Sequence, residues 1–472
     1  MKKVSQVIKV EPLDYAPNFK DFGPDKILAA SGILTMKNKD FEKTLEQIDD
    51  KTLKGFHNEA TRRGHASLTT SVNYYFWIEG SRIIDFYFSS FPFGSYLVFS
   101  SRRIDIGTEN LVIPDSIENS RFKNEYEEIC KRMVDLYHRI EEETGSKDHA
   151  RRILPIGFIS KLFFNLPLQA ILGIIKEVKE DEKRKDPVLP KEIWEIAKLL
   201  EQNIKTNTSY LADALLNLTY NTNYPHPNLF NSDTDFQKPY TKILLKDENF
   251  GKLLNDVKNN LRIETGNPKD RIKESSRVWK EFVENIQDKI LLEAKITGSL
   301  SIWNDIKRHR SVRQKVESIY HATERCLNNW DENNFYMPQV KNSGLREEII
   351  DAYKGALEFY KKMVENGIEK RDAIYVIPHG INLGIRMFLD GYHIFDPFGF
   401  IGIRACTTTD HEIVAMVNKI INDLKKDLPE TEHLLGPKCK LGFCPERNFC
   451  GVVKQFVRNY DENLHSISNN LV

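Results

Sequence analysis

An internal repeat constrains the fold of this chain more than any other feature of its sequence. LYHRIEEETGSKDHARRILPIGF, from Leu136, and FYKKMVENGIEKRDAIYVIPHGI, from Phe359, share a charged amphipathic helix, a Gly break, a basic patch and an apolar strand-like run ending in Pro and Gly. Pro155 aligns with Pro378 in this repeat. We call the separation of these two residues along the sequence the proline spacing. A repeat of this length predicts two similar units in tandem.

A second match upstream keeps almost the same spacing. FWIEGSRIID and AKITGSLSIWNDI align around a shared Ile-x-Gly-Ser that pairs Ser81 with Ser299, and the separation of these two residues is called the serine spacing. Two matches in the same order are hard to obtain by chance, so we predict a tandem duplication with halves 1–235 and 236–472. The junction is expected in the stretch NTNYPHPNLFNSDTDFQKPY from Asn221, which is rich in turn and breaker residues.

Length and charge limit the classes of protein. The 472 residues suffice for two or three domains, and 68 basic against 68 acidic residues leave no global attraction for nucleic acid or membrane. An anionic ligand must therefore be held by local clusters. The start, MKKVSQVIKVEPLD, has no apolar core typical of a signal peptide, and the apolar runs are too short to span a bilayer, so a cytoplasmic protein is expected.

Periodicity predicts a mixed helix and sheet fold of the α+β class. SVNYYFWIEG and IIDFYFSSF are rich in aromatic and β-branched residues, which indicates buried strands or an apolar helix. Helical periodicity is clearest in five charged stretches, residues 125–143, 190–203, 277–293, 346–366 and 410–426.

The strongest local signal is the basic segment KRHRSVRQKVESIYHA, residues 307–322. Its Arg-His-Arg triplet offers planar, bidentate donors suited to a phosphate, a pyrophosphate or an anionic ring, with a titratable imidazole between them. On composition alone, the alternative is a solvated basic helix face. Six basic side chains fall within nine residues: Lys307, Arg308, His309, Arg310, Arg313 and Lys315.

This segment resembles the flavin-dependent thymidylate synthases. That family carries Arg-His-Arg followed by a Ser-x-Asn-x-x-Ser-x-Arg-Tyr tail, whose second Ser matches Ser318, whereas Arg313, Lys315 and Tyr320 depart from the pattern. The resemblance implies two diverged copies of the family fold, a mixed sheet flanked by helices, joined as a pseudo-dimer. It also implies FAD as cofactor.

The first half keeps other parts of the family pattern. GHASLTTSVNYYFWIEGSR resembles the family's Gly-His-x-Ser segment, with His65 and Ser67 retained. Counting back from Arg308 by the serine spacing gives Ser90, Phe91 and Pro92, so this half lacks the basic triplet. The family's Ser-x-Arg nevertheless recurs at Ser100 and Arg102.

Two further arginines match the family. HARRILP resembles Ala-Arg-x-x-Leu-Pro, which places Arg151 at a nucleotide-contacting position where the second half has Ile374. IRACTTTDHEI resembles Leu-Arg-x-x-x-x-Ala-Gln-x-Glu-Ile, in which Arg404 meets the pyrimidine and Glu412 keeps the spacing. The first half shows no equivalent of Arg404.

The resemblance assigns roles to these residues. The two halves are complementary, as expected if a symmetric oligomer with composite sites was fused and each copy kept one side. A homodimer, and hence a pseudo-tetramer, is the expected assembly. Arg404 and Arg151 are the catalytic candidates; Ser100, Arg102, Ser318 and Arg404 are expected to bind substrate; Arg308, His309, Arg310, His65 and Ser67 are expected to surround the flavin.

A separate cluster of cysteines closes the chain, in the tail of residues 433–452. Cys439, Cys444 and Cys450, with His433 as a further donor, could hold zinc or an iron–sulfur cluster. Ordinary or redox-labile thiols are the alternative. The other three cysteines are scattered and indicate no disulfide framework.

The reaction implied by the resemblance is thymidylate synthesis. FAD reduced by NADPH delivers a hydride while the one-carbon unit of methylenetetrahydrofolate is transferred to C5 of dUMP, giving dTMP. Arginines at the ring then act as preorganised electrostatic partners. Alternatives are a flavin enzyme with another pyrimidine or nucleic-acid acceptor, and a non-catalytic nucleotide-binding protein. Binding of RNA or DNA is disfavoured by the neutral net charge.

Overall fold

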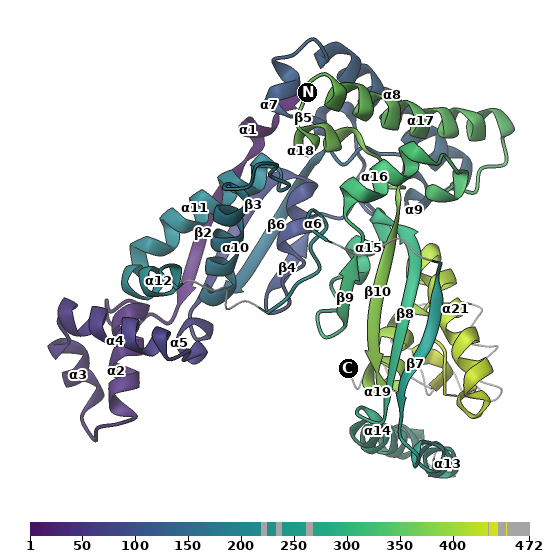
Figure 1. Ribbon diagram of the computed structural model, residues 1–472. Coiled ribbons are helices and arrows are strands. Elements are labelled where there is room, and N and C mark those ends of the chain that lie inside the picture. The colour runs from purple at the N-terminus through teal and green to yellow at the C-terminus, as the bar shows by residue number, and fades with distance from the viewer. Residues whose placement is uncertain (219–223, 233–237, 261–267, 433, 442–449, 451–472) are drawn as a thin grey trace. The chain divides into compact units, whose positions relative to one another are not determined.

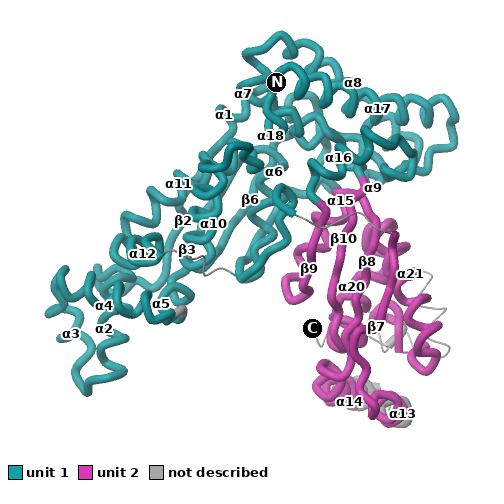
Figure 2. Tube along the Cα trace, in the orientation of Figure 1, with its two compact units in different colours: residues 1–233, 318–381 teal, residues 234–317, 382–472 magenta. Residues whose placement is uncertain are grey.

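The computed structural model describes residues 1–218, 224–232, 238–260, 268–432, 434–441 and 450 (Figure 1). Two compact units form from discontinuous parts of the chain, residues 1–233 with 318–381 and residues 234–317 with 382–472 (Figure 2). The expected halves describe a repeat of the sequence rather than these units, and they stay a prediction. Among the described residues, no helix combines the length and the apolar character that spanning a bilayer requires.

The first unit is built on a four-stranded antiparallel sheet in the order β2-β3-β6-β4. Alternate residues of β3 are buried, including Tyr74, Phe76 and Ile78, as the aromatic run predicts. The next run, IIDFYF, forms the short helix α6, which contacts β3 and β6. The strands are β2 (Lys9–Ala16), β3 (Asn73–Ser81), β4 (Ser95–Val98) and β6 (Ile159–Pro167), beside a two-stranded pair of β1 (Lys2–Lys3) and β5 (Val112–Ile113).

The first unit contains fifteen described helices, of which α11 contacts β2 and α10 contacts β6. They are α1 (Val4–Val7), α2 (Pro24–Leu34), α3 (Phe41–Gln47), α4 (Asp50–Arg62), α5 (Ala66–Thr70), α6 (Ile83–Phe88), α7 (Asp115–Glu118), α8 (Lys123–Thr144), α9 (Lys147–Ala150), α10 (Leu168–Asp181), α11 (Lys191–Asn207), α12 (Ser209–Leu216), α16 (Ile319–Asn328), α17 (Ser343–Glu365) and α18 (Lys370–Ala373), with 3-10 turns η1 (Thr108–Asn110), η2 (Glu332–Asn334) and η3 (Ile374–Val376).

The second unit has a sheet with the same strand order. Its strands run β7-β8-β10-β9, so in both sheets the strands stand in the order first, second, fourth, third along the chain. Helix α15 contacts β8 and β10 as α6 contacts β3 and β6. The elements are β7 (Tyr240–Lys246), β8 (Ile290–Ser299), β9 (Arg313–Val316), β10 (Asn382–Asp390), α13 (Phe250–Asn260), α14 (Pro268–Ile286), α15 (Leu300–Ile306), α19 (Gly391–Phe395), α20 (Phe400–Arg404), α21 (His411–Asp427), η4 (Pro429–Thr431) and η5 (Lys438–Leu441).

In both sheets, a glutamate accepts hydrogen bonds from the serine at the end of the second strand, β3 or β8. In the first sheet, Glu192 accepts hydrogen bonds from the backbone N and the Oγ of Ser81. In the second, Glu412 accepts from the same two groups of Ser299, each at 2.7 Å. Glu192 and Glu412 lie in the first turn of α11 and α21, at a separation intermediate between the serine and proline spacings. The paired serines predicted from Ile-x-Gly-Ser therefore share the same contacts.

Two long helices of the first unit, α8 and α17, pack against each other through ion pairs that follow the proline spacing. Arg139 Nη1 lies 2.6 Å from a carboxylate oxygen of Glu348, and Lys362 Nζ lies 2.7 Å from one of Glu125. The proline spacing carries Arg139 onto Lys362 and Glu125 onto Glu348. Exchanging the two helices thus exchanges the two ion pairs.

The paired prolines of the sequence repeat lie against each other, Pro155 bridging Pro378 in antiparallel fashion. Flanking hydrogen bonds follow a local twofold pattern. The backbone N of Ile156 donates to the carbonyl of Ile377 at 2.9 Å, and that of His379 donates to Leu154 at 2.9 Å. The two strand-like runs expected here are mostly irregular. Only a few backbone hydrogen bonds join them, and the 3-10 turn η3 occupies part of the second run.

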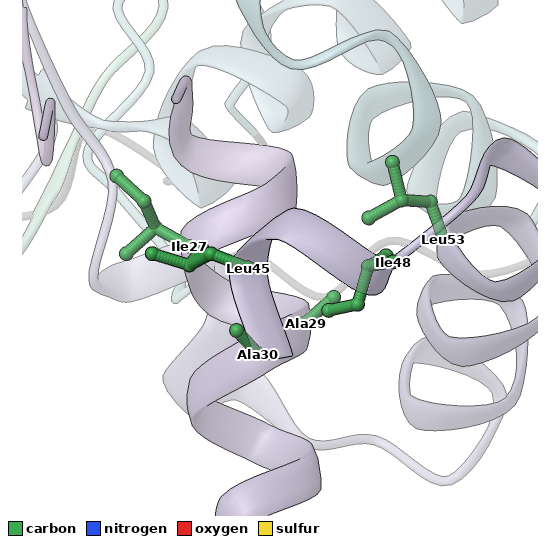
Figure 3. Packing of buried hydrophobic residues seen from close by; sticks show 6 residues of the cluster. All are labelled: Ile27, Ala29, Ala30, Leu45, Ile48 and Leu53. Atoms are coloured by element: carbon green, nitrogen blue, oxygen red, sulfur yellow. The ribbon is translucent and has the colours of Figure 1, made fainter. Parts of the chain in front are cut away.

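A small cluster of hydrophobic side chains holds α2, α3 and α4 together in the first unit (Figure 3). Asp40 and Asp49 cap α3 and α4 by accepting from Lys43 N at 2.9 Å and Thr52 N at 2.8 Å. The end of α4 leads into α5, where two of the expected flavin residues lie, and the backbone N of His65 donates to the carbonyl of Ala60 at 3.1 Å. The cluster consists of Ile27, Ala29, Ala30, Leu45, Ile48 and Leu53.

The five expected helical stretches correspond to α8, α11, α14, α17 and α21. One expectation extends too far, because α14 ends at Ile286 and the chain enters β8 at Ile290. The residues of ILLEAKI are largely buried and pair on both edges, with β7 and β10. Tertiary pairing therefore overrides the helical periodicity at this end.

Candidate functional site

Residues 307–312 of the basic segment form the turn between α15 and β9 in the second unit. Arg313 and Lys315 lie on β9, and the segment from Ser318 onward belongs to the first unit. Lys307 is only 2% exposed, and its ammonium lies 4.7 Å from the centre of the Trp303 ring. Arg308 is exposed, with Nη2 2.6 Å from Oδ1 of the buried Asp305. Because part of the segment is enclosed, it is not simply a solvated helix face. The contacts of Lys307 with Trp303 and of Arg308 with Asp305 hold this turn against α15.

Arg404 and His309 meet in the second unit, which the sequence spacing does not predict. Nε of Arg404 donates to Nε2 of His309 at 2.6 Å, and Nη2 donates to the backbone carbonyl of Asp305 at 2.9 Å. Two-point contact fixes the plane of the guanidinium. Gly402, two residues earlier, lets α20 turn tightly, since a Cβ there would lie 2.3 Å from the carbonyl oxygen of Pro397.

His309 is uncharged at neutral pH. Burial lowers the pKa of His309 to about 3, with the positive charges of Arg404 and Arg308 adding to the effect. Its ring meets Phe400 edge-on, with centroids 5.0 Å apart. Because Arg404 can only donate, Nε2 of the imidazole is the acceptor and Nδ1 carries the proton.

The chain that follows Arg404 is held at the start of α21. Glu412 ties the start of α21 to Ser299, where α15 begins. Asp410 caps α21 by accepting from the backbone N of Glu412 at 3.0 Å. The helix that leads into the basic turn and the helix that follows Arg404 are thus joined through one carboxylate.

A second set of candidates gathers around Asp148 in the first unit. Nε and Nη2 of Arg102 each donate to a different oxygen of Asp148 at 2.7 Å. Arg151, 4% exposed, has its Nε 3.5 Å from Oδ1 of the same carboxylate. Ser100 lies in the loop that carries Arg102, and its carbonyl accepts from the backbone of Arg103 at 3.1 Å. Arg102 and Arg151 are therefore brought together.

The remaining candidates belong to neither of these clusters. His65 and Ser67 are exposed at the start of α5. Ser318 is buried at the N-cap of α16, where its carbonyl accepts from Ala322 N at 2.9 Å. His65, Ser67, Ser100, Arg102, Arg151 and Ser318 are part of the first unit, and Arg308, His309, Arg310 and Arg404 are part of the second.

Sequence reasoning missed the carboxylates that hold these arginines. Asp305 precedes Arg308 by three residues, a spacing at which side chains on one helical turn meet. Asp148 precedes Arg151 by three residues as well. Glu192 could have been found from the sequence. The tripeptide KEI at the start of α11 and HEI at the start of α21 are separated by nearly the same distance along the chain as the other repeat pairs.

A buried imidazole lies close to the arginines of the first unit. His379 is 4% exposed, with ring centroids 5.6 Å from Phe86 and 5.3 Å from Phe158. Burial lowers the pKa of His379 to about 3, and the charge of Arg82 is the next cause. Its Nδ1 lies 3.0 Å from the carbonyl oxygen of Leu154.

Replacing His379 with phenylalanine is expected to reduce the loss of stability in acid. A folded-state pKa depressed below the ordinary value of 6.5 gives stability that is present above that value and lost as pH falls towards 3. At about pH 5 the histidine should cost about 2 kcal/mol relative to neutral pH. The carbonyl of Leu154 keeps the backbone bond from residue 379. Urea unfolding of both proteins at about pH 7.5 and about pH 5 measures the difference; equal acid losses would contradict the expectation.

The cysteine cluster is described only in part. Cys439 is buried and Cys450 is half-buried, whereas Cys444 and His433 lie outside the described residues. The metal site therefore stays a prediction. Within the described ranges, a group with metal-ligand spacing is formed by Asp105, His138 and Glu141. Nζ of Lys147 lies 3.0 Å from Asp105 and 2.9 Å from Glu141, so a cation already neutralises these carboxylates.

Comparison with known proteins gives the family. The sequence model of the family described as thymidylate synthase complementing protein matches residues 20–205 and 256–430, more than half of the chain. The chain belongs to this family. The resemblance read from the Arg-His-Arg segment is thereby confirmed, and both matched segments contribute residues to the clusters described above.

Curated relatives in the family are named flavin-dependent thymidylate synthase. The protein from Saccharolobus solfataricus is 26% identical over 178 residues, covering 37% of this chain and 62% of the relative. That from Sulfurisphaera tokodaii is 30% identical over 146 residues, covering 30% and 55%. The chain thus spans between 55% and 62% of the length of these relatives.

A solved structure also resembles the chain, though weakly. The UMP/dUMP methylase PolB from Streptomyces cacaoi bound with 5-Br dUMP is 14% identical, with a TM-score of 0.36, over 44% of this chain and 94% of that one. A likeness of this size carries no argument about the site.

Proposed function

We propose that this member of the thymidylate synthase complementing protein family is a flavin-dependent enzyme that methylates dUMP. It would transfer the one-carbon unit of methylenetetrahydrofolate to C5 of dUMP, with NADPH as reductant, and release dTMP. The observation that carries the proposal is the contact of Arg404 with His309, because it joins two separate family motifs through a 2.6 Å hydrogen bond. Family membership and the names of the relatives support the same reaction.

The donors around the basic turn suit an anionic cofactor such as FAD. Arg308 and Arg310 flank a neutral imidazole, so two guanidinium groups face an anion without a competing charge on His309. These two arginines would hold the phosphates of FAD, with His65 and Ser67 as further proposed contacts. Bound flavin would supply the hydride. The role of the chain is then to bind and orient it.

Arg102 and Arg151 are proposed to bind the nucleotide phosphate, together with Ser100. The two parallel hydrogen bonds that Arg102 makes to Asp148 use the same donors that a phosphate requires. Arg404 is proposed to meet the pyrimidine, where a fixed guanidinium would stabilise electron density pushed onto the ring carbonyls. Ser318 remains a proposed phosphate contact on sequence grounds.

We also propose that the chain arose by tandem duplication. Three independent features support this: the shared strand order of the two sheets, the Ser and Glu pairs that close both, and the ion pairs of α8 and α17 that exchange at the proline spacing. A symmetric homodimer of a shorter ancestor gives all three.

Purified full-length protein tests the function in two measurements. An absorbance spectrum is expected to contain the bands of oxidised flavin, and dUMP with methylenetetrahydrofolate and NADPH is expected to give dTMP. A yellow protein that leaves dUMP unchanged would favour another pyrimidine or nucleic-acid acceptor. A colourless protein that takes up no FAD on titration would overturn the flavin enzyme in favour of a non-catalytic nucleotide-binding protein.

A further inference from the structure

We propose that residues 224–231 are an internal plug that seals a second, degenerate nucleotide site, so that each chain binds one nucleotide. The inference rests on the proposed function and on the proposed duplication. A fused pair of copies would carry two sites by symmetry. Most counterparts of the functional residues in the second site are no longer basic, and all of them lie in the first unit.

The counterparts follow from the two repeat spacings. At the serine spacing, Ser90, Phe91 and Pro92 stand for the Arg-His-Arg triplet, and Tyr320 stands for Arg102. At the proline spacing, Ile374 stands for Arg151. Arg184 stands for Arg404, because it precedes Glu192 by as many residues as Arg404 precedes Glu412, an equivalent that the motif comparison missed. The second site would therefore keep one guanidinium and have uncharged groups at the other positions. Nη1 of Arg184 donates to Oδ1 of Asn231 in the plug at 3.3 Å, so the plug already engages this remaining cation.

The plug fills the place of the lost triplet. Nδ1 of His226 lies 2.8 Å from Oγ of Ser90, and the imidazole stacks on Phe91 with centroids 4.0 Å apart. Its Nε2 lies 3.0 Å from a carboxylate oxygen of Glu177 on α10. The side-chain amide of Asn228 donates to the other oxygen of Glu177. One carboxylate thus anchors two residues of the plug.

The other side of the degenerate site is closed as well. Tyr320 is 7% exposed, and its hydroxyl donates to the carbonyl of Val188 at 2.6 Å. Its ring lies 6.3 Å from that of Phe230 in the plug. The backbone N of Ile319 donates to the carbonyl of Leu229 at 2.9 Å. Plug residues therefore contact both halves of the degenerate site within one compact unit.

Asp181 lies beside Arg184, with a carboxylate oxygen 3.8 Å from its Nε, and holds the chain that follows α10. Its carboxylate accepts from the backbone N of Val188 at 3.0 Å and of Leu189 at 2.9 Å, and from Trp194 Nε1 at 3.2 Å. These bonds fix the backbone at Val188 and Leu189. The carbonyl of Val188 in turn accepts the hydrogen bond from the Tyr320 hydroxyl. The carboxylate beside Arg184 and the closure of the site by Tyr320 thus belong to one arrangement of contacts.

The plug is preorganised by its own turn. Oδ1 of Asn228 accepts from the backbone N of Phe230 at 2.9 Å and of Asn231 at 3.3 Å. Because the segment is covalently attached, its effective concentration at the site is high, on the order of millimolar. A free nucleotide would have to displace it and compete with Asn231 of the plug for Arg184, without the other arginines of the first site. The degenerate site should stay closed.

Hydrogen exchange on the full chain without ligand tests the plug itself. Backbone amides of Phe230 and Asn231 are expected to be protected in the wild type. Glu177→Ala removes the anchor of His226 and Asn228 and should speed their exchange by about tenfold or more. Glu180→Ala, on the exposed face of the same helix, is the matched control and should leave exchange unchanged. Exchange at the unstructured rate in the wild type, or equal effects of the two variants, would overturn the plug.

Calorimetric titration of wild type with dUMP tests the count of sites. One nucleotide per chain is expected, and two per chain would overturn the inference even if the plug is ordered. If no dUMP binds, the result counts against the proposed function and also overturns the count of one nucleotide per chain. The exchange measurement still decides whether residues 224–231 seal the degenerate site. The two failures are thus distinguishable.

Discussion

Replacing Arg404 with alanine is expected to lower kcat/KM for dTMP formation by about two to three orders of magnitude, or about 3–4 kcal/mol of transition-state stabilisation. The physical reason is that Arg404 is held at two points, Nε on His309 and Nη2 on Asp305. Its guanidinium is therefore fixed before the substrate arrives and needs no reorganisation as charge develops. Steady-state rates with varied dUMP measure the effect.

Two companion variants separate position from charge. Arg404→Lys keeps the positive charge but loses the planar two-point contact, so it should recover little of the rate. Arg313→Ala removes an exposed guanidinium from the same basic segment, where it lies 5.3 Å from the Phe388 ring centre. Its rate should stay within about threefold of wild type, since exposed charges contribute little. A fully active Arg404→Ala protein would remove the residue from the proposed site.

The repeat is the part of the fold most open to prediction from sequence. Pro155 and Pro378 pair by pattern, and they lie against each other in the structure. Ser81 and Ser299 pair in the same way, and both donate to a glutamate. Such matches succeed because Gly, Pro and small polar residues mark backbone positions that tolerate few substitutes.

Choosing between strand and helix is harder for short apolar runs. SVNYYFWIEG forms β3, yet IIDFYF directly after it forms α6. Both runs are buried on most sides, so hydrophobic periodicity is lost and tertiary neighbours decide. The same limit explains why the expected helix of residues 277–293 continues as β8.

Contacts within the site are least predictable. Side chains from separate segments meet there, such as His309 with Arg404 and Ser90 with His226. No local spacing encodes these pairs, because they depend on where the sheets place their ends. The composition of the Asn/Pro/Asp-rich stretch predicts a junction between the halves, but it does not predict that His226 within this stretch contacts Ser90 and Phe91.

Replacing Glu192 with alanine is expected to be the most destabilising single change among the residues described above. Glu192 is 1% exposed and accepts from Ser81 N, from Ser81 Oγ at 2.5 Å and from the Tyr375 hydroxyl at 2.8 Å. Alanine would leave three buried donors without this acceptor, at a cost of about 3–5 kcal/mol. Urea unfolding measures the loss. Glu412→Ala is the matched control in the second sheet, and because Glu412 is only half-buried its cost should be smaller, about 1–3 kcal/mol.

Glutamine at position 192 separates the hydrogen bonds from the charge. Burial raises the pKa of Glu192 above its ordinary value of 4.5, although the bonds from Ser81 and Tyr375 oppose the shift. A raised folded-state pKa gives stability that is full below the unfolded value and lost as pH rises through the folded one. Glu192→Gln cannot ionise, so its stability relative to wild type should improve as pH rises from 4.5. If the difference between the two proteins were constant with pH, the carboxylate would act through its hydrogen bonds alone, and the buried charge would carry no cost for the fold.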